Sequence, residues 1–140
     1  MKKILIIGEE NACRSQMAEG WMRYYTRNHA EVVSAGIAKQ PVDLHAANSM
    51  SNAVMDISKH VSKDIDEVNG EEYDFVLYVF EPASLDGIEL KGTPKVIVQP
   101  FDRPQPGANA KETDANYDRV RDEIENYCFD FAHQYIRKLY

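Results

Sequence analysis

The residues best placed for chemistry lie in a loop near the N-terminus, between an apolar run and a helical pattern. The run, Lys2–Ile7, has the length of a buried strand, and the helix is expected to open at Arg14 or Ser15. A loop that feeds a helix N-terminus gathers unpaired backbone N–H groups and adds the positive end of the helix dipole. Arg14 can add a planar, bidentate guanidinium. The stretch predicts a socket for a tetrahedral oxyanion; the alternative is an ordinary turn with an exposed arginine. The loop 8–15 comprises Gly8, Glu9, Glu10, Asn11, Ala12, Cys13, Arg14 and Ser15.

The same stretch resembles the signature of the low-molecular-weight protein tyrosine phosphatases and of the related thioredoxin-coupled arsenate reductases. In that signature a cysteine, five further residues, an arginine and a serine follow an N-terminal strand, and a helix comes next. The segment Asn11–Glu19 matches it closely. Counting back six residues from Arg14 places Gly8 where the resemblance expects the nucleophilic cysteine. Cys13 corresponds instead to the second cysteine of the resembled loop.

The resemblance extends over nearly the whole chain and implies the fold of that family. Strand patterns that alternate with helix patterns also indicate βαβ units and a parallel sheet of about four strands. The expected fold is therefore a three-layer α/β/α arrangement with a four-stranded parallel sheet in the order 2-1-3-4. Residues 1–140 are expected to form one such domain. Further matching segments are Val33–Ile37, Met55–His60, Tyr73–Val76 and Arg119–Ile124.

Periodicity and turn residues assign the remaining elements. Three more strands are expected at 31–35, 73–80 and 94–99, and helices at 15–28, 44–55, 61–68 and from 117 to the end. The segment 100–115, which holds three prolines, is expected to be a long irregular loop over the socket, as a lid or a partner surface.

Two sets of reactive groups that the resemblance implies are missing. A phosphatase of this type needs a thiolate that attacks phosphorus and a general acid that protonates the leaving oxygen. The resemblance puts the acid directly before a proline, and here Arg103 precedes Pro104. Asp102 stands one place early and is a candidate substitute. An arsenate reductase needs further cysteines on and after the third strand, and none occurs between Tyr73 and Lys95.

Glu9 and Glu10 stand where the resembled loop has small neutral residues, and they oppose an incoming dianion. At about 6 Å and an effective dielectric of 20, each repulsion is on the order of 2–3 kcal/mol before screening. The gain from Arg14 and the backbone donors is of comparable size, so phosphate affinity is expected to be weak. One hypothesis is that a carboxylate, from Glu9, Glu10 or a partner, replaces the anion against Arg14. The alternative is that both glutamates point into water.

Cys13 has two interpretations. It is either a redox-sensitive thiol activated by the helix N-terminus or a small residue packed under the helix, and the second is preferred. Cys128 lies on the apolar face of the last helix and is expected in the core. The four histidines show no ligand spacing, so neither a metal site nor a cofactor is expected. The catalytic candidates are limited to Cys13, Arg14 and Asp102.

Composition bounds the partners and the compartment. A formal net charge of −7 and a pI near 5.1 argue against nucleic acid or an anionic membrane as a partner. The apolar run at the start is too short for a signal peptide or a membrane span. Two cysteines without a secretory signal indicate a reducing cytoplasm.

The sequence therefore predicts a phosphatase- or arsenate-reductase-like domain that has lost catalysis and binds a ligand at the loop 8–14. The ligand is a small oxyanion (phosphate, arsenate or sulfate), a carboxylate or a protein partner. The alternative is an active or repurposed phosphatase or arsenate reductase, with Cys13 or a carboxylate as nucleophile and Asp102 as acid. A third hypothesis is an interaction module or homodimer in which the socket is vestigial.

Overall fold

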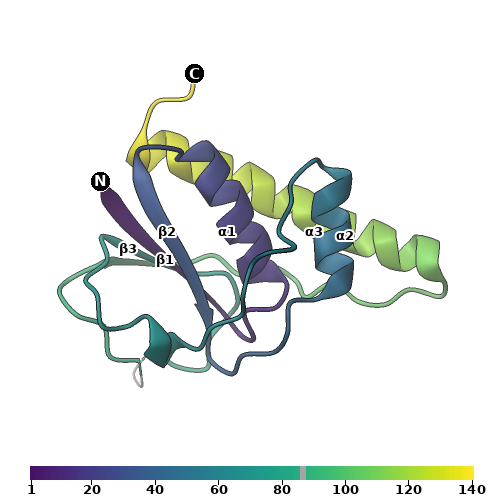
Figure 1. Ribbon diagram of the computed structural model, residues 1–140, viewed down its shortest axis with the longest axis horizontal. Helices are drawn as coiled ribbons and strands as arrows, with labels where there is room; N and C mark the ends of the chain where they lie inside the picture. The colour runs from purple at the N-terminus through teal and green to yellow at the C-terminus, as the bar shows by residue number, and fades with distance from the viewer. Residues whose placement is uncertain (86–87) are drawn as a thin grey trace.

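The computed structural model describes residues 1–85 and 88–140, and its centre is a four-stranded parallel sheet (Figure 1). The strand order is β2-β1-β3-β4, which confirms the predicted order 2-1-3-4. In the register, Gly8 at the end of β1 lies opposite Gly36 of β2, and Ile7 lies opposite Tyr78 of β3. The strands are β1 (Lys2–Gly8), β2 (Ala30–Gly36), β3 (Phe75–Tyr78) and β4 (Lys95–Val98).

Helices cover one face of the sheet and a thinner layer covers the other, so the α/β/α class is confirmed. Ile4 and Ile6 of β1 share a core cluster with side chains of α1 (Arg14–Tyr25), α2 (Leu44–Asn52) and α3 (Ala110–Phe131). Their neighbours in β1, Leu5 and Ile7, face a second cluster. That cluster is closed by the single turn η1 (Ile65–Glu67) and by three loop side chains. The three are Val68, Ile88 and Leu90. Every apolar residue of β1 from Ile4 to Ile7 is fully buried, as expected for a central parallel strand.

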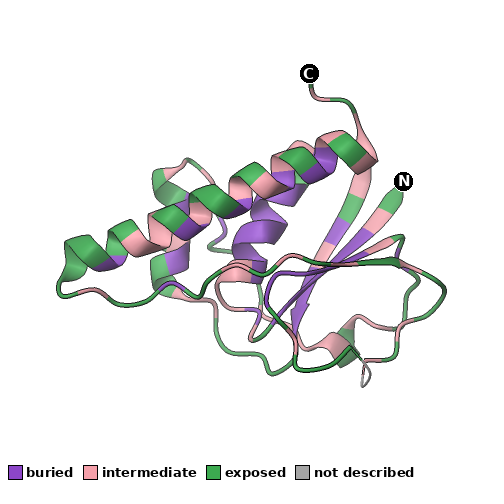
Figure 2. Cartoon of the chain, turned by 180° about the vertical axis from the view of Figure 1, so that it is seen from behind, coloured by how far each residue is buried: buried purple, intermediate pink, exposed green. Residues whose placement is uncertain are grey.

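The two long helices differ in how much of their surface is buried (Figure 2). The segment Ser15–Met22 of α1 is buried on all sides, polar residues included. By contrast, α3 buries one side only, which carries Val120, Ile124 and Cys128. The predicted core position of Cys128 is confirmed. Within the described residues, no helix combines the length and the apolar character that a membrane span requires.

The last helix begins earlier than the sequence pattern suggested. α3 starts at Ala110, because Asn109 caps it: the Asn109 side chain accepts a hydrogen bond from the Glu112 N–H at 2.9 Å. The predicted irregular loop is confirmed over residues 100–109, but the prediction was wrong over 110–116, which are helical. α3 is followed by a π-helical turn, η2 (Ala132–Ile136).

Other boundaries are also shorter than predicted. The predicted helix over 61–68 is reduced to η1, and the predicted strand over 73–80 pairs only from Phe75 to Tyr78. Tyr73 and Phe80 are nevertheless buried in the second cluster. These two buried aromatic residues gave the sequence a strand-like composition, although among the described residues neither pairs with a neighbouring strand.

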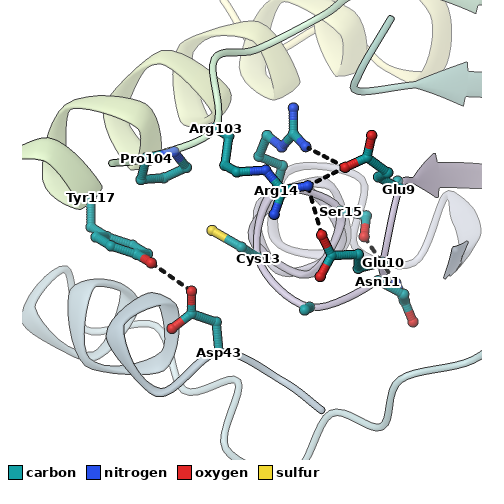
Figure 3. Close-up of a pocket in the computed structure, with 12 residues that line it drawn as sticks. Glu9, Glu10, Asn11, Cys13, Arg14, Ser15, Asp43, Arg103, Pro104 and Tyr117 are labelled. Atoms are coloured by element: carbon teal, nitrogen blue, oxygen red, sulfur yellow. Dashed lines mark hydrogen bonds and ion pairs between the residues drawn. The ribbon is translucent and has the colours of Figure 1, made fainter. Parts of the chain in front are cut away.

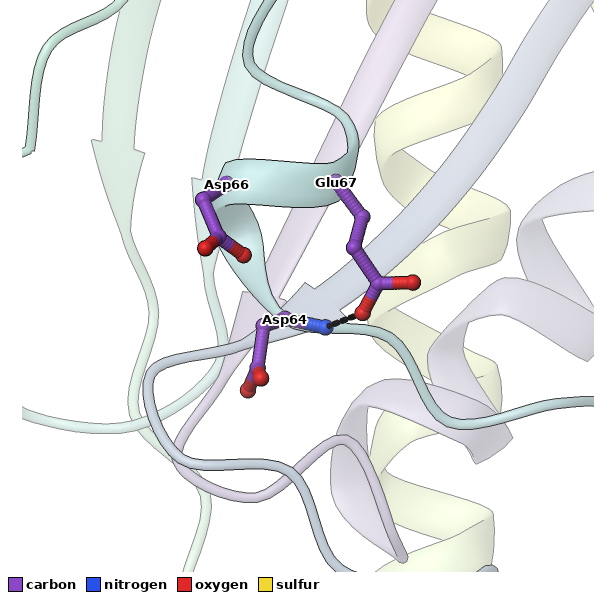
Figure 4. A group of neighbouring side chains, drawn as sticks. All are labelled: Asp64, Asp66 and Glu67. Carbon is purple, nitrogen blue, oxygen red and sulfur yellow. Dashed lines mark hydrogen bonds between the residues drawn. The ribbon is translucent and has the colours of Figure 1, made fainter.

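The turn η1 is held by its own acidic residues (Figure 4). Asp64 and Glu67 form a capping box, in which the Asp64 N–H donates to Glu67 Oε2 at 2.7 Å. Asp64 Oδ1 also accepts a hydrogen bond from the Lys39 N–H at 2.7 Å. Glu67 also pairs with Lys39 Nζ at 3.2 Å. Carboxylate oxygens of Asp64, Asp66 and Glu67 lie within 4.8 Å of one another. Because two of the three carboxylates already act as caps, the turn itself accounts for this cluster.

Candidate anion-binding site

A small cavity opens at the carboxyl end of β1, where the loop 8–15 leads into α1 (Figure 3). Its volume is about 100 Å³. Parallel α/β sheets bind ligands beyond the carboxyl ends of their strands, so this is the predicted place. Every residue of the predicted loop lines the cavity, together with side chains from three distant segments. The lining residues are Gly8, Glu9, Glu10, Asn11, Ala12, Cys13, Arg14, Ser15, Asp43, Arg103, Pro104 and Tyr117.

Within the described part of the chain, the backbone carbonyl groups of the loop are hydrogen-bonded, whereas its backbone N–H groups beyond Gly8 are not. The carbonyls of Glu9, Glu10 and Ala12 accept hydrogen bonds from N–H groups of the segment 37–43. The N–H groups of residues 9–15 have no acceptor among the residues that the structure describes. Carbonyls bound from outside and N–H groups left free are the features of a backbone nest for an anion.

Asn11 fixes the shape of the loop from below. It is 1% exposed and has a φ of 52°, a left-handed conformation that asparagine tolerates better than most residues. Its Nδ2 donates to Ser15 Oγ at 3.0 Å and to Ser34 Oγ at 2.9 Å. Its Oδ1 accepts from the Lys63 N–H at 2.8 Å. The side chain thus ties the loop to the start of α1, to β2 and to the segment before η1.

The network continues through a buried carboxylate. Ser34 donates from both its N–H (3.1 Å) and its Oγ (2.7 Å) to Glu19 Oε1, and the Glu19 side chain is only 4% exposed. His60 Nδ1 lies 3.4 Å from Glu19 Oε2 and 2.9 Å from Gln16 Oε1. Gln16 Nε2 donates to Asn11, so Oε1 is the acceptor and His60 donates from Nδ1. Burial lowers the pKa of His60, while Glu19 opposes the shift.

We call these side chains the foot network: Asn11, Ser15, Gln16, Glu19, Ser34 and His60. Sequence reasoning placed Glu19 and His60 in matching motifs but assigned them no part in the site. A signal was available, because Glu19 and Gln16 interrupt a helix whose neighbouring residues read as core. Polar residues on a buried helix need partners, and such partners are supplied by another segment.

At the open side of the cavity, acidic residues meet a base. Arg103 Nη2 lies 2.6 Å from Glu10 Oε1 and also contacts Glu9 Oε2. These contacts, the Glu10 hydrogen bond first, raise the pKa of Arg103. We call Glu9, Glu10 and Arg103 the mouth cluster. The sequence showed that Arg103 stands in the place of the expected acid, but it did not indicate that Arg103 pairs with Glu9 and Glu10.

Arg14 lies beneath the mouth cluster and has its own partner. Its Nη1 donates to the Phe101 carbonyl at 2.9 Å, and its Nη2 lies 4.0 Å from Glu9 Oε2. Burial lowers the pKa of Arg14, and the nearby charge of Arg103 acts in the same direction. The sequence hypothesis had a carboxylate replace the anion at Arg14, and its alternative had both glutamates in water. The structure bears out the hypothesis in part: Glu9 forms a long ion pair with Arg14, and both carboxylates also pair with Arg103.

Cys13 lines the cavity opposite an Asp43–Tyr117 pair (Figure 3). Tyr117 Oη donates to Asp43 Oδ2 at 2.6 Å. Burial, followed by the charge of Asp43, raises the pKa of Cys13 to about 12, so the thiol is protonated at neutral pH. Cys13 also packs against the main core cluster. These observations support the packing interpretation over an activated thiol.

A side chain at position 8 fits only if Ser15 shifts. A Cβ on Gly8 would lie 2.5 Å from Ser15 Oγ and 2.7 Å from Ser15 Cβ. The hydroxyl is held there by Asn11 Nδ2. Asp102, the candidate acid, is exposed and is not among the residues that line the cavity. Its offset of one place from Pro104 leaves Arg103 as the residue that faces the site.

A parallel sheet of this order, with an anion loop between its central strand and first helix, defines an α/β protein of the phosphatase-like type. The match to the family described as low molecular weight phosphotyrosine protein phosphatase spans residues 3–139, and the chain belongs to that family. It is 34% identical over 135 residues to an arsenate reductase of Halalkalibacterium halodurans, covering 94% of this chain and 95% of that protein. The family resemblance seen in the sequence is thereby confirmed.

Solved structures agree with the fold. An arsenate reductase in the phosphate binding state is 25% identical with a TM-score of 0.70, over 93% of this chain and 98% of the other. Wzb of Vibrio vulnificus in complex with benzylphosphonate has a TM-score of 0.76 at 19% identity, over 95% and 98% of the two chains. The second likeness concerns the fold alone.

Proposed function

We propose that this family member binds a small tetrahedral oxyanion at the loop 8–15 and does not turn over phosphomonoesters by thiolate chemistry. One observation carries the proposal. The loop keeps the donors of an oxyanion socket, while position 8 offers no thiol, and a side chain there would require Ser15 to shift. Phosphate, arsenate and sulfate share the geometry that such donors recognise. The phosphate-bound state of a structural relative supports this ligand class.

Charge at the site is compatible with weak anion binding. Arg14 supplies a largely buried cation at the close of the loop. Arg103 pairs with Glu9 and Glu10, so the repulsion that these carboxylates exert on an anion is largely offset. The backbone N–H groups then decide the balance in favour of binding.

Cysteine-based catalysis lacks both of its working groups at this site. The thiolate is the reactive form of cysteine, and reactive cysteines have a lowered pKa. The only thiol at the cavity among the described residues is Cys13, whose pKa is raised to about 12. The residue that faces the site from the 99–109 segment is Arg103, which is always protonated and cannot serve as a general acid. We therefore propose a pseudoenzyme that acts by binding.

The named relatives favour a second candidate function. Proteins called arsenate reductase match this chain at 34% identity over most of its length. On this view the chain is an enzyme that uses Cys13 or a carboxylate as nucleophile and Asp102 as acid. A third possibility at the same loop is a carboxylate ligand or a protein partner, including a second copy of the chain. Both cysteines are free thiols, which suits a reducing cytoplasm.

Amide chemical shifts test the proposal. Adding inorganic phosphate, arsenate or sulfate to ¹⁵N-labelled protein should move the resonances of residues 8–15 and few others. Arg14→Gln should remove the response. Arg119→Gln on the exposed side of α3 removes the same charge elsewhere and should leave it intact. No response to any of the three anions would overturn oxyanion binding.

Turnover separates the two candidates. Wild-type protein should neither hydrolyse p-nitrophenyl phosphate nor reduce arsenate with thioredoxin present as reductant. Activity that persists through repurification and disappears in Cys13→Ser or Asp102→Asn would select the enzyme instead.

A further inference from the structure

A cation occupies the position from which the family resemblance expects an acid. Arg103 lines the cavity, and Figure 3 shows its side chain next to that of Arg14 above the loop. The two charges are close enough for Arg103 to lower the pKa of Arg14. Two guanidinium groups on one small cavity repel each other unless negative charge lies between or beside them. This site therefore has one more cation than a single Arg14 would supply.

In the structure, the negative charge beside Arg103 comes from the protein itself. Glu10 and Glu9 both contact Arg103 Nη2, and the side chains of Arg103, Glu9 and Glu10 are 46%, 48% and 32% exposed. Ion pairs this exposed are weak, because water competes for both partners and salt screens them. Exchange of a glutamate for another oxyanion on Arg103 therefore costs little.

We propose that Arg103 is a second anion-binding residue. When an oxyanion binds, Arg103 gives up its ion pairs with Glu9 and Glu10 and contacts the oxyanion from the side opposite Arg14. The inference rests on the proposed function and adds a residue that sets its specificity. Planar guanidinium groups bind tetrahedral oxyanions through paired N–H donors, so two of them select a dianion. The ligand class is a dianionic tetrahedral oxyanion: phosphate, arsenate, sulfate or a phosphomonoester. An arginine at position 103 helps to hold the bound oxyanion. A general acid at this position would instead protonate the leaving oxygen of a phosphomonoester.

The experiment must separate contact from net charge. Arg103→Gln alone would expose two unpaired carboxylates, and their repulsion would weaken binding even without any contact. The test therefore uses the Glu9→Gln/Glu10→Gln background, in which these carboxylates are absent. Isothermal titration with inorganic phosphate at constant salt gives the dissociation constant of each variant.

The expected order of affinities is specific. Glu9→Gln/Glu10→Gln should bind phosphate roughly tenfold more tightly than wild type, because the competing carboxylates are gone. Adding Arg103→Gln to this background should weaken binding roughly tenfold or more, the usual effect of losing a charged hydrogen-bond donor. Adding Arg103→Lys should give an intermediate value, because the charge stays and the paired donors are lost. Adding Arg119→Gln, a remote loss of the same charge, should change affinity less than about twofold.

Each outcome decides a separate question. Equal affinity with and without Arg103 in the neutral background overturns this inference and leaves the proposed function intact, provided that Arg14→Gln still removes binding. Failure of wild-type protein to bind phosphate overturns the proposed function and this inference together. Circular dichroism checks that each variant is folded. Because the side chains of Glu9, Glu10 and Arg103 are one third to one half exposed, their substitution should not unfold the protein, so a loss of phosphate affinity reports on binding.

Discussion

The two sides of the loop 8–15 are built from different interactions. Below the loop, the foot network consists of buried side chains, with Asn11 1% exposed and the Glu19 side chain 4% exposed. Above it, the mouth cluster consists of ion pairs whose members are one third to one half exposed. The foot network fixes the backbone conformation of the loop, and the mouth cluster sets the charges that a ligand meets at the cavity opening. The comparison shows how the mouth can change in sequence while the cradle persists.

Energetics explain why the two sides tolerate change differently. A buried donor or acceptor that loses its partner keeps the full cost of its desolvation. An exposed ion pair that is broken is replaced by water at little cost. Changes of charge are therefore accepted at the mouth, where Glu9 and Glu10 stand in place of neutral residues and Arg103 in place of an acid. A comparable change in the foot would cost the fold itself.

The largest effect is expected from Asn11→Ala, which cuts the foot network at its centre. The change removes hydrogen bonds to Ser15, Ser34 and Lys63 and places alanine in a left-handed conformation. The free energy of unfolding should fall by about 2–4 kcal/mol in a urea titration. Asn48→Ala, at an exposed position on α2, should stay within about 0.5 kcal/mol of wild type. A loss below about 1 kcal/mol for Asn11→Ala would remove the distinction between foot and mouth.

The next effect comes from restoring a cysteine at position 8. Gly8→Cys places a Cβ against Ser15 Oγ, and overpacking of this kind should lower stability by about 1–3 kcal/mol. Gly70→Cys is the matched control, because a Cβ there meets nothing within 4 Å. Stability equal to the control would show that Ser15 moves aside freely.

A smaller effect on stability is expected when the pH is lowered and His60 of the foot network becomes protonated. Burial lowers the pKa of His60 below its ordinary value of about 6.5, with Arg23 and Lys63 adding to the shift and Glu19 and Asp56 opposing it. The unfolded state then binds the proton more readily, so stability should fall as pH drops below about 6.5. Above that pH, His60 contributes no slope.

The His60 contribution can be isolated by comparing pH profiles of unfolding between pH 5 and 8. One proton limits its slope to about 1.4 kcal/mol per pH unit. His60→Gln should flatten the profile on the acid side, whereas His29→Gln at an exposed position should leave it unchanged. A profile that His60→Gln leaves unaltered would mean that the histidine does not titrate against the foot network.

The smallest effect is expected at the mouth. Arg103→Gln breaks both ion pairs of the cluster, yet it should change the free energy of unfolding by less than about 1 kcal/mol because the pairs are exposed. The difference from wild type should shrink further in 0.5 M sodium chloride. A loss above about 2 kcal/mol would mean that the mouth cluster holds the fold as the foot does.

The sequence was most informative where local pattern determines structure. The apolar run of β1, the periodic helices and the loop before Arg14 all predicted their elements, because burial and helix spacing leave a local mark. The start of α3 was missed because three prolines suggested a continuing loop, whereas Asn109 begins a capped helix. The pattern at Tyr73 and Phe80 indicated strand, since aromatic burial resembles strand composition.

The parts of the site that depend on distant contacts could not be predicted. Asp43, Arg103 and Tyr117 reach the cavity only because α2, the 99–109 segment and α3 meet at the end of β1. The unusual sign of Arg103 was visible in the sequence, and so were the two glutamates. Their pairing was not, because nothing local shows that positions so far apart along the chain close over the same opening.

One ³¹P NMR measurement tests the central claim directly, because it reports binding and turnover in the same sample. With p-nitrophenyl phosphate and wild-type protein, the ester resonance should broaden, and excess arsenate should restore its width. No inorganic phosphate should appear beyond the rate in buffer alone. An inorganic phosphate resonance that grows with protein concentration, or an ester resonance that the protein leaves unbroadened, would contradict the account.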